Sequence, residues 1–204
     1  MPRAGLTPTV VAEAAAVIAD DVGYDRLTLA AVAERCGVRL PSLYKHVDGL
    51  DGLRRELALL ALRELYEALT RAAMGRSGRE ALHAVAASYR AWARAHPGRY
   101  VATLRAPARG DRAYAAAGEA AVGVVAAVLL GYHVNDPDDV TDATRMLRSL
   151  LHGFVTLEAA GGFGRPRALD RSFDRMVTAL DVAFAGWATS TTMNETPVAS
   201  GRKG

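Results

Sequence analysis

The sequence is poor in cysteine, lysine and aromatic residues. Its 204 residues include one cysteine, Cys36, and two lysines, Lys45 and Lys203. A single cysteine excludes an intramolecular disulfide framework and a CxxC metal or redox motif. Aromatic residues form 6% of the chain and the formal net charge is +3, which is too small to indicate a polybasic nucleic-acid binder. Composition alone therefore assigns no function, and local motifs have to supply it.

The chain also lacks a strongly apolar run. No continuous apolar segment occurs near the N-terminus, so no signal peptide is predicted. The most apolar stretch, residues 113–132, contains Glu119 and three glycines, whereas a membrane span needs about 20 strongly apolar residues. We expect this stretch to form a central buried helix. The protein is expected to be soluble and cytoplasmic, with no membrane partner.

Hydrophobic residues are plentiful and follow a helical pattern. They form 50% of the chain, and alanine, the strongest helix former, occurs 41 times. Apolar residues recur at helical spacing, with no strand-like alternation. Thr7 before Pro8, and Thr28 before Leu29, have the residue types of helix N-caps. The expected fold class is all-α, with about nine helices near 8–22, 29–36, 40–46, 50–74, 79–96, 99–106, 111–133, 138–160 and 169–188.

Residues 28–47 contain the most specific functional motif. They predict two short helices joined by a turn at Gly37, which is the helix-turn-helix pattern. Ala33 is small enough for the helix crossing, and Val38 and Leu43 fill the core between the helices. The outward positions of the second helix are those that enter the major groove of DNA in such motifs. The predicted DNA-contacting residues are Thr28, Arg39, Leu40, Pro41, Ser42, Tyr44, Lys45 and His46.

Each of these residues also has an ordinary structural interpretation. Thr28 is a candidate N-cap whether or not its helix points at a phosphate. Tyr44 could pack in the core rather than place its hydroxyl on a phosphate. Lys45 and His46 could be plain surface residues. Cys36, at the end of an apolar helix face, is interpreted as a core residue rather than a redox sensor.

The run from Thr28 to the Leu43-Tyr44-x-His46-Val47 ending resembles the TetR family of bacterial transcriptional repressors. Later segments at 89–92, 96–100 and 151–163 resemble the C-terminal domain of one subgroup, called WHG. The resemblance implies a homodimer with a DNA-binding domain at 1–57 and a ligand-binding and dimerisation domain at 58–190. The polar residues after Ser190 predict a disordered tail at 191–204. The resemblance also implies repression at a palindromic DNA operator, relieved by a small ligand through a shift of the long helix.

Two departures from the family pattern concern DNA binding. Arg39 stands where a serine or threonine often caps the recognition helix. The segment Asp48–Asp51 lacks the lysine that often follows that helix, and residues 1–57 contain seven cations against eight acids. A degenerate relative that binds a ligand or partner without reading DNA is therefore an alternative. An enzyme is not expected, since catalytic motifs such as a nucleophile elbow or a phosphate loop are missing.

The second half of the chain predicts a ligand cavity among its helices. Aromatic and polar residues there serve either as core or as the wall of a pocket for a small apolar or aromatic molecule. The candidate pocket residues are Tyr89, Trp92, His96, Tyr100, Leu104, Tyr114, His152 and Phe154.

The last two helices predict a dimer. Each has one regular apolar stripe and further apolar residues beside it, so each needs two partners. One face would pack on its own domain and the other on a second subunit, with a monomeric bundle as the alternative. The candidate interface residues are Leu147, Leu150, Phe154, Phe173, Met176, Val177, Leu180 and Phe184.

No cofactor or metal is expected. His133 lies near Asp136, Asp138 and Asp139, which resembles a loose metal cluster. Helix capping explains the same aspartates more simply.

Overall fold

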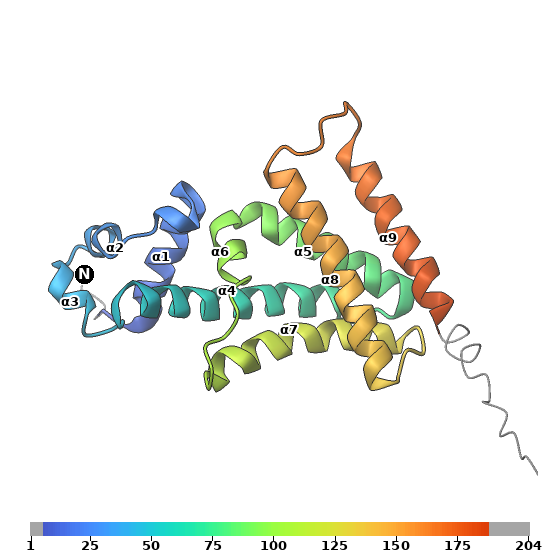
Figure 1. The fold of residues 1–204 in the computed structure, drawn as a ribbon, viewed down its shortest axis with the longest axis horizontal. Coiled ribbons are helices and arrows are strands. Elements are labelled where there is room, and N and C mark those ends of the chain that lie inside the picture. The colour runs from blue at the N-terminus through green and yellow to red at the C-terminus, as the bar shows by residue number, and fades with distance from the viewer. Residues whose placement is uncertain (1–5, 188–204) are drawn as a thin grey trace, which may run out of the picture.

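A computed structural model describes residues 6–187, and the regular secondary structure of this range is all helical (Figure 1). The predicted all-α class is confirmed. The predicted disordered tail at 191–204 lies outside the described residues. The elements are α1 (Pro8–Val22), a 3-10 turn (Tyr24–Arg26), α2 (Leu29–Arg35), α3 (Leu40–Leu43), α4 (Gly49–Ala73), α5 (Gly78–Ala95), α6 (Pro97–Ala102), α7 (Arg112–Leu130), α8 (Pro137–Ala159) and α9 (Leu169–Ala185).

Side-chain caps begin several of these helices, as the sequence predicts. The Thr7 hydroxyl accepts a hydrogen bond from the Val10 amide, and the Thr28 hydroxyl accepts one from the Ala31 amide, both at 3.2 Å. Asp136 Oδ1 accepts from the backbone amides that open α8. The helix-capping interpretation of that aspartate is therefore confirmed.

Two hydrophobic cores lie along the chain, and α4 runs through both (Figure 1). Helices α1–α3 and the first half of α4 form a head around residues such as Val11, Leu43 and Leu57. The second half of α4 packs on α5 and α7 and shares a second core with α8 and α9. The predicted domain boundary at residue 57 thus falls inside a continuous helix. Ala102 and Tyr114, from beyond that boundary, also belong to the head core.

The prediction of a central buried helix at residues 113–132 is wrong. Helix α7 packs one face on α4, but only 17% of its most apolar window is buried. Its mean hydropathy of 1.8 would also suit a membrane span, a test that core helices of soluble proteins pass as well. Much of the helix is alanine and glycine, whose small side chains leave space beside the core.

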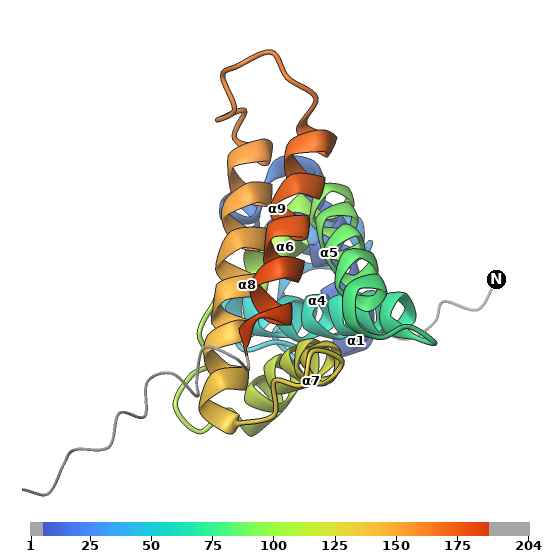
Figure 2. The same cartoon turned by 90° about the vertical axis from the view of Figure 1, so that its right-hand side faces the viewer.

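Helices α8 and α9 lie side by side on one side of the bundle (Figure 2). A loop joins them, and α5 packs against both. This pair forms an outer layer of the C-terminal part.

Candidate DNA-binding and ligand-binding sites

The helix-turn-helix of the head has the predicted turn. Gly37 has φ of +66°, a left-handed conformation that favours glycine. The Val38 amide then donates to the Ala33 carbonyl at 3.0 Å, which closes the turn between α2 and α3. Leu43 is fully buried and Ala33 nearly so. Ala33, Gly37 and Leu43 of the helix-turn-helix motif therefore have the places that the sequence predicts.

Helix α3 is shorter than the predicted helix at 40–46. It ends at Leu43, and the chain forms a turn through His46. Its N-cap, Arg39, makes no side-chain hydrogen bond to the helix, as expected for a side chain that cannot accept one. Tyr44 is 56% exposed, so the core interpretation of its ring is wrong. Arg39 and Lys45 are exposed and form no ion pair within residues 6–187.

The other predicted DNA contacts differ in exposure. Thr28, Leu40 and Pro41 are exposed, whereas Ser42 and His46 are half-buried. All of them lie on α3, on the turn that follows it, or at the start of α2.

Cations from the C-terminal part neutralise part of the acidic charge of the head. Arg99 Nε lies 3.0 Å from Asp20 Oδ2, and the Arg99 amide donates to Asp20 Oδ1 at 2.9 Å. Arg105 Nη2 lies 3.9 Å from Asp51 Oδ1. The net charge of residues 1–57 therefore overstates the repulsion that DNA phosphates would meet.

A cavity of about 540 Å³ opens among α4, α5, α7 and α8. Its volume falls within the range of small-molecule sites, and most of its wall is apolar. Its wall consists of Leu62, Leu65, Leu69, Val85, Tyr89, Thr103, Leu104, Arg105, Pro107, Tyr114, Ala115, Gly118, Glu119, Ala121, Val122, Gly123, Val125, Thr144, Leu147, Arg148 and Leu151.

Three of the predicted pocket residues, Tyr89, Leu104 and Tyr114, line this cavity. Trp92 and His96 do not, because they border a separate, charged hollow of about 220 Å³ whose other lining residues are Glu64, Glu67, Arg71 and Arg99. Helical spacing places Tyr89 and Trp92 on one face of α5, but the sequence does not show which neighbouring segments cover each part of that face.

The remaining predicted pocket residues lie behind the wall. The Tyr100 hydroxyl is 2.9 Å from the Tyr89 hydroxyl and 2.6 Å from His152 Nδ1, so Tyr100 connects His152 to Tyr89, and of the three residues Tyr89 alone lines the cavity. Burial raises the pKa of Tyr100. Phe154 packs edge-on against Phe173 within the core. Their placement in the pocket is therefore corrected.

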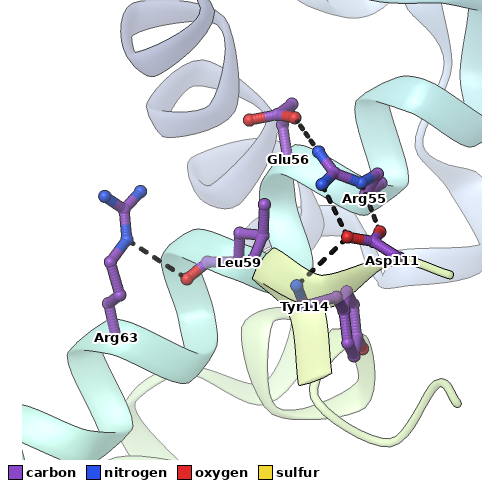
Figure 3. Close-up of polar contacts among 6 residues, drawn as sticks. All are labelled: Arg55, Glu56, Leu59, Arg63, Asp111 and Tyr114. Atoms are coloured by element: carbon purple, nitrogen blue, oxygen red, sulfur yellow. Dashed lines mark hydrogen bonds and ion pairs between the residues drawn. The ribbon is translucent and has the colours of Figure 1, made fainter. Parts of the chain in front are cut away.

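A charged contact joins the N-terminal end of α7 to α4 (Figure 3). Arg55 of α4 donates to both carboxylate oxygens of Asp111, with Nη2 2.8 Å from Oδ1. Asp111 Oδ1 also accepts from the Tyr114 amide and so caps α7. The hydrogen bond and charge of Arg55 hold the pKa of Asp111 below its usual value. The sequence has no signal for this pair, since 56 residues separate its members.

The segment between α6 and α7 also contacts the head. The Tyr114 hydroxyl donates to the Arg105 carbonyl at 2.9 Å. Arg105 Nη1 in turn donates to the Tyr24 hydroxyl of the head at 3.3 Å. Thr103, Leu104, Arg105 and Pro107 from this segment all line the cavity. One wall of the cavity is therefore the surface that contacts the head.

The predicted dimer stripe is mostly buried within the single chain. Six of its members are 7% exposed or less and pack in the C-terminal core: Leu147, Phe154, Phe173, Val177, Leu180 and Phe184. Met176 is half-buried, and Leu150 is 39% exposed. A side chain buried in its own core has no surface left for a partner. The exposed large apolar residues of these two helices are Leu150, Leu157 and Val182.

Cys36 is half-buried beside the head core, in agreement with the packing interpretation. Burial raises the pKa of its thiol, which makes the thiolate less accessible. Within the described range no group of three or more histidine, cysteine, aspartate or glutamate residues has the geometry of a metal site.

Sequence comparisons match both parts of the chain. Residues 11–57 match the model for bacterial regulatory proteins of the tetR family, and residues 82–180 match that for a tetracyclin repressor-like C-terminal domain. The HTH-type transcriptional regulator Rv0681 of Mycobacterium tuberculosis is 39% identical over 159 residues, which cover 78% of this chain and 72% of the relative. The chain belongs to the TetR family. It is thus a member of a family of helix-turn-helix transcriptional regulators rather than of enzymes.

A second relative, the HTH-type transcriptional regulator YobS of Bacillus subtilis, is 37% identical over 164 residues, which cover 80% of this chain and 85% of the relative. Among solved structures, a Rhodococcus sp. RHA1 protein has a TM-score of 0.76 at 23% identity, covering 91% of this chain and 99% of that one. BioQ with its double-stranded DNA operator has a TM-score of 0.65 at 21% identity, covering 89% and 99%. A TetR variant of Acinetobacter baumannii in complex with minocycline has a TM-score of 0.65 at 23% identity, covering 91% and 98%. These structures share the fold.

Proposed function

We propose that this TetR-family regulator is a cytoplasmic homodimeric repressor that a small, largely apolar molecule releases from a palindromic operator. The observation that carries this proposal is the shared wall of the cavity, because residues 103–105, 107 and 114 line it and Arg105 among them also bonds to Tyr24 of the head. A ligand in the cavity would press on the segment that positions the head. The ligand would then lower the affinity for the operator, and the operator would lower the affinity for the ligand by the same factor.

The head would read DNA through α3 and the turn after it. Tyr44, Lys45 and Arg39 support this role, since they are exposed and no acid of the described chain pairs with them. Lysine and arginine at such positions bind phosphates. Ser42 on α3 and His46 on the turn after it are the candidates for contacts with base edges. The BioQ structure with its operator shows that the shared fold can bind double-stranded DNA. The alternative of a member without DNA binding is not favoured.

A gel-shift titration with the DNA that flanks the protein's own gene tests DNA binding. Lys45→Ala should weaken binding about tenfold at low salt and lower the slope of log affinity against log salt by about one, because one phosphate contact is lost. Arg171→Ala, on α9 away from the head, is the charge-matched control and should bind like the unmodified protein. Equal affinity of both variants and the unmodified protein would contradict the proposed role of α3.

Ligand release is tested with two probes, 2-naphthoate and 2-naphthalenemethanol. A probe that raises the melting temperature should also release the DNA. Gly118→Phe should abolish both effects, since Gly118 lies in the cavity wall and a side chain there meets open space. This variant should still bind DNA. A probe that stabilises the protein through the cavity and leaves the DNA bound would refute ligand release.

The Arg55–Asp111 pair would carry the signal to α4 from α7, which Asp111 caps and which lines the cavity. Arg55→Ala and Asp111→Ala should each retain DNA and probe binding but reduce probe-induced release about fivefold, and the double variant should be no worse than either single variant. Arg63→Ala is the control, because Arg63 Nε bonds to Leu59 O within α4 (Figure 3). Unchanged release in both single variants, measured by fluorescence anisotropy of labelled DNA, would exclude this route.

A further inference from the structure

Some polar groups of the cavity wall have hydrogen-bond partners within the chain, and others have none. The Tyr114 hydroxyl donates to backbone carbonyls, and the Thr103 hydroxyl donates to the Tyr100 carbonyl at 2.7 Å. Arg105 contacts the Tyr24 hydroxyl and faces Asp51. These groups already have partners, so they are poorly placed to bind a ligand. The polar wall residues that lack partners therefore have to orient the ligand.

Helix α8 contributes two polar groups without partners. Thr144 is 8% exposed, and its buried hydroxyl oxygen has no hydrogen-bond partner within residues 6–187. Arg148 forms no hydrogen bond or ion pair within residues 6–187. The two residues are one helical turn apart, so they share the face of α8 that lines the cavity. A buried hydroxyl without a partner is costly, and a ligand oxygen would relieve that cost.

One carboxylate, Glu119 of α7, also lines the cavity without a partner in the described chain. Burial raises the pKa of Tyr89, Tyr100 and Tyr114, and the positive charge of the exposed Arg148 opposes this rise in all three. The Arg148 charge therefore acts on tyrosines in and beside the cavity wall.

We propose that the cavity binds a monoanionic carboxylic acid with an apolar body, whose carboxylate pairs with Arg148 and accepts a hydrogen bond from Thr144. The planar guanidinium matches a carboxylate through two parallel hydrogen bonds. The apolar body lies against Leu65, Leu69 and Val85. This inference rests on the proposed function, since it names the chemical class of the releasing ligand.

Three probes with one ring system and different charge test the assignment by calorimetry: 2-naphthoate, 2-naphthalenemethanol and 2-naphthylmethylammonium. Naphthoate should bind about tenfold more tightly than the alcohol, and the ammonium compound more weakly than both. Arg148→Gln should remove the preference for naphthoate and leave alcohol binding within about twofold. Thr144→Val should weaken naphthoate binding in the same way but less.

Arg145→Gln is the matched control, because Arg145 lies on the same helix outside the cavity wall. It should leave the binding of all three probes unchanged. Equal affinity for naphthoate and the alcohol, equal losses of both in Arg148→Gln, or no binding of naphthoate would overturn the inference. Tightest binding of the ammonium compound would also overturn it and would assign the anchor to Glu119. If the alcohol binds as well as naphthoate and releases the DNA equally, the proposed function stands and only the ligand class fails.

Discussion

Arg90 is a buried charge that joins three helices of the C-terminal part. Its Nε and Nη2 donate to the two carboxylate oxygens of Glu158 at 2.8 and 2.6 Å, and its Nη1 lies 2.9 Å from Asp170 Oδ1. The guanidinium also lies over the rings of Phe154 and Phe173. Arg90 thus links α5 to α8 and α9, the two helices of the outer layer.

Removal of Glu158 should destabilise the protein in a pH-dependent way. The hydrogen bond and charge of Arg90 lower the pKa of Glu158. The pair therefore stabilises the fold fully above the pKa of Glu158 in the unfolded chain, and this contribution is lost as the pH falls through the lower folded-state pKa. Glu158→Gln should cost about 3 kcal/mol at pH 7, since it leaves a largely buried cation with fewer partners.

Urea unfolding at pH 7 and at about pH 3 measures this difference. The free energies of unfolding of the variant and the unmodified protein should converge at the lower pH. The control is Glu67→Gln, whose i,i+4 contact with Arg71 is exposed and should contribute little at either pH. A loss for Glu158→Gln that is equal at both pH values would indicate packing rather than charge.

Single residues also show how far the sequence could predict the site. Leu43, Gly37 and Thr28 were correctly assigned, because a buried plug, a left-handed turn and an N-cap each have a local signature. Arg148 was missed, because an arginine on an amphipathic helix resembles any solvated side chain until the neighbouring helices are placed. The Arg55–Asp111 contact depends on chain segments that only the tertiary fold brings together.

At the scale of elements, α6 meets α1 without intervening side chains. A Cβ atom at Gly98 would overlap the carbonyl group of Ala19, so the two backbones touch there. This crossing places Arg99 beside Asp20 and connects the C-terminal part to the head. Helix α6 can approach so closely only because residue 98 has no side chain.

Gly98→Ala should therefore separate α6 from α1. We expect a loss of about 2–3 kcal/mol in the free energy of unfolding, because the backbone cannot yield as a flexible side chain would. The matched control, Gly118→Ala, meets open space in α7 and should gain up to about 1 kcal/mol through helix propensity. Denaturant titration of both variants provides the comparison, and a neutral Gly98→Ala would show that the helices move apart freely.

Helix existence was predictable, but helix environment was not. Prolines, caps and glycines mark the ends of α1, α5 and α8, and the sequence places these within a few residues. The assignment of α7 to a central position was wrong, because an alanine-rich apolar run looks the same whether it faces a core, a cavity or solvent. The short α3 was overestimated since the turn after Leu43 also keeps helix-like hydrogen bonds.

The whole molecule is proposed to be a homodimer, as is typical of the TetR family. The outer layer of α8 and α9 leaves Leu150, Leu157 and Val182 exposed at 39%, 48% and 68%. Leu150→Arg combined with Val182→Arg should yield a monomer of 21.6 kDa in light scattering, because charges do not fit the apolar centre of an obligate interface. Leu130→Arg, on exposed α7, should remain dimeric. If only the α7 variant dissociates, the interface lies on that helix instead.

The continuity of α4 has a mechanical consequence. Its 25 residues extend about 37 Å at about 1.5 Å per residue. A rigid rod of that length converts a tilt of about 5° at its cavity end into a displacement of about 3 Å at the head, close to the rise of about one base pair. Two such rods moving in opposite directions would change the spacing between the reading heads by about two base pairs. A small angular change in the bundle is therefore enough to take both heads out of phase with the helical repeat of DNA.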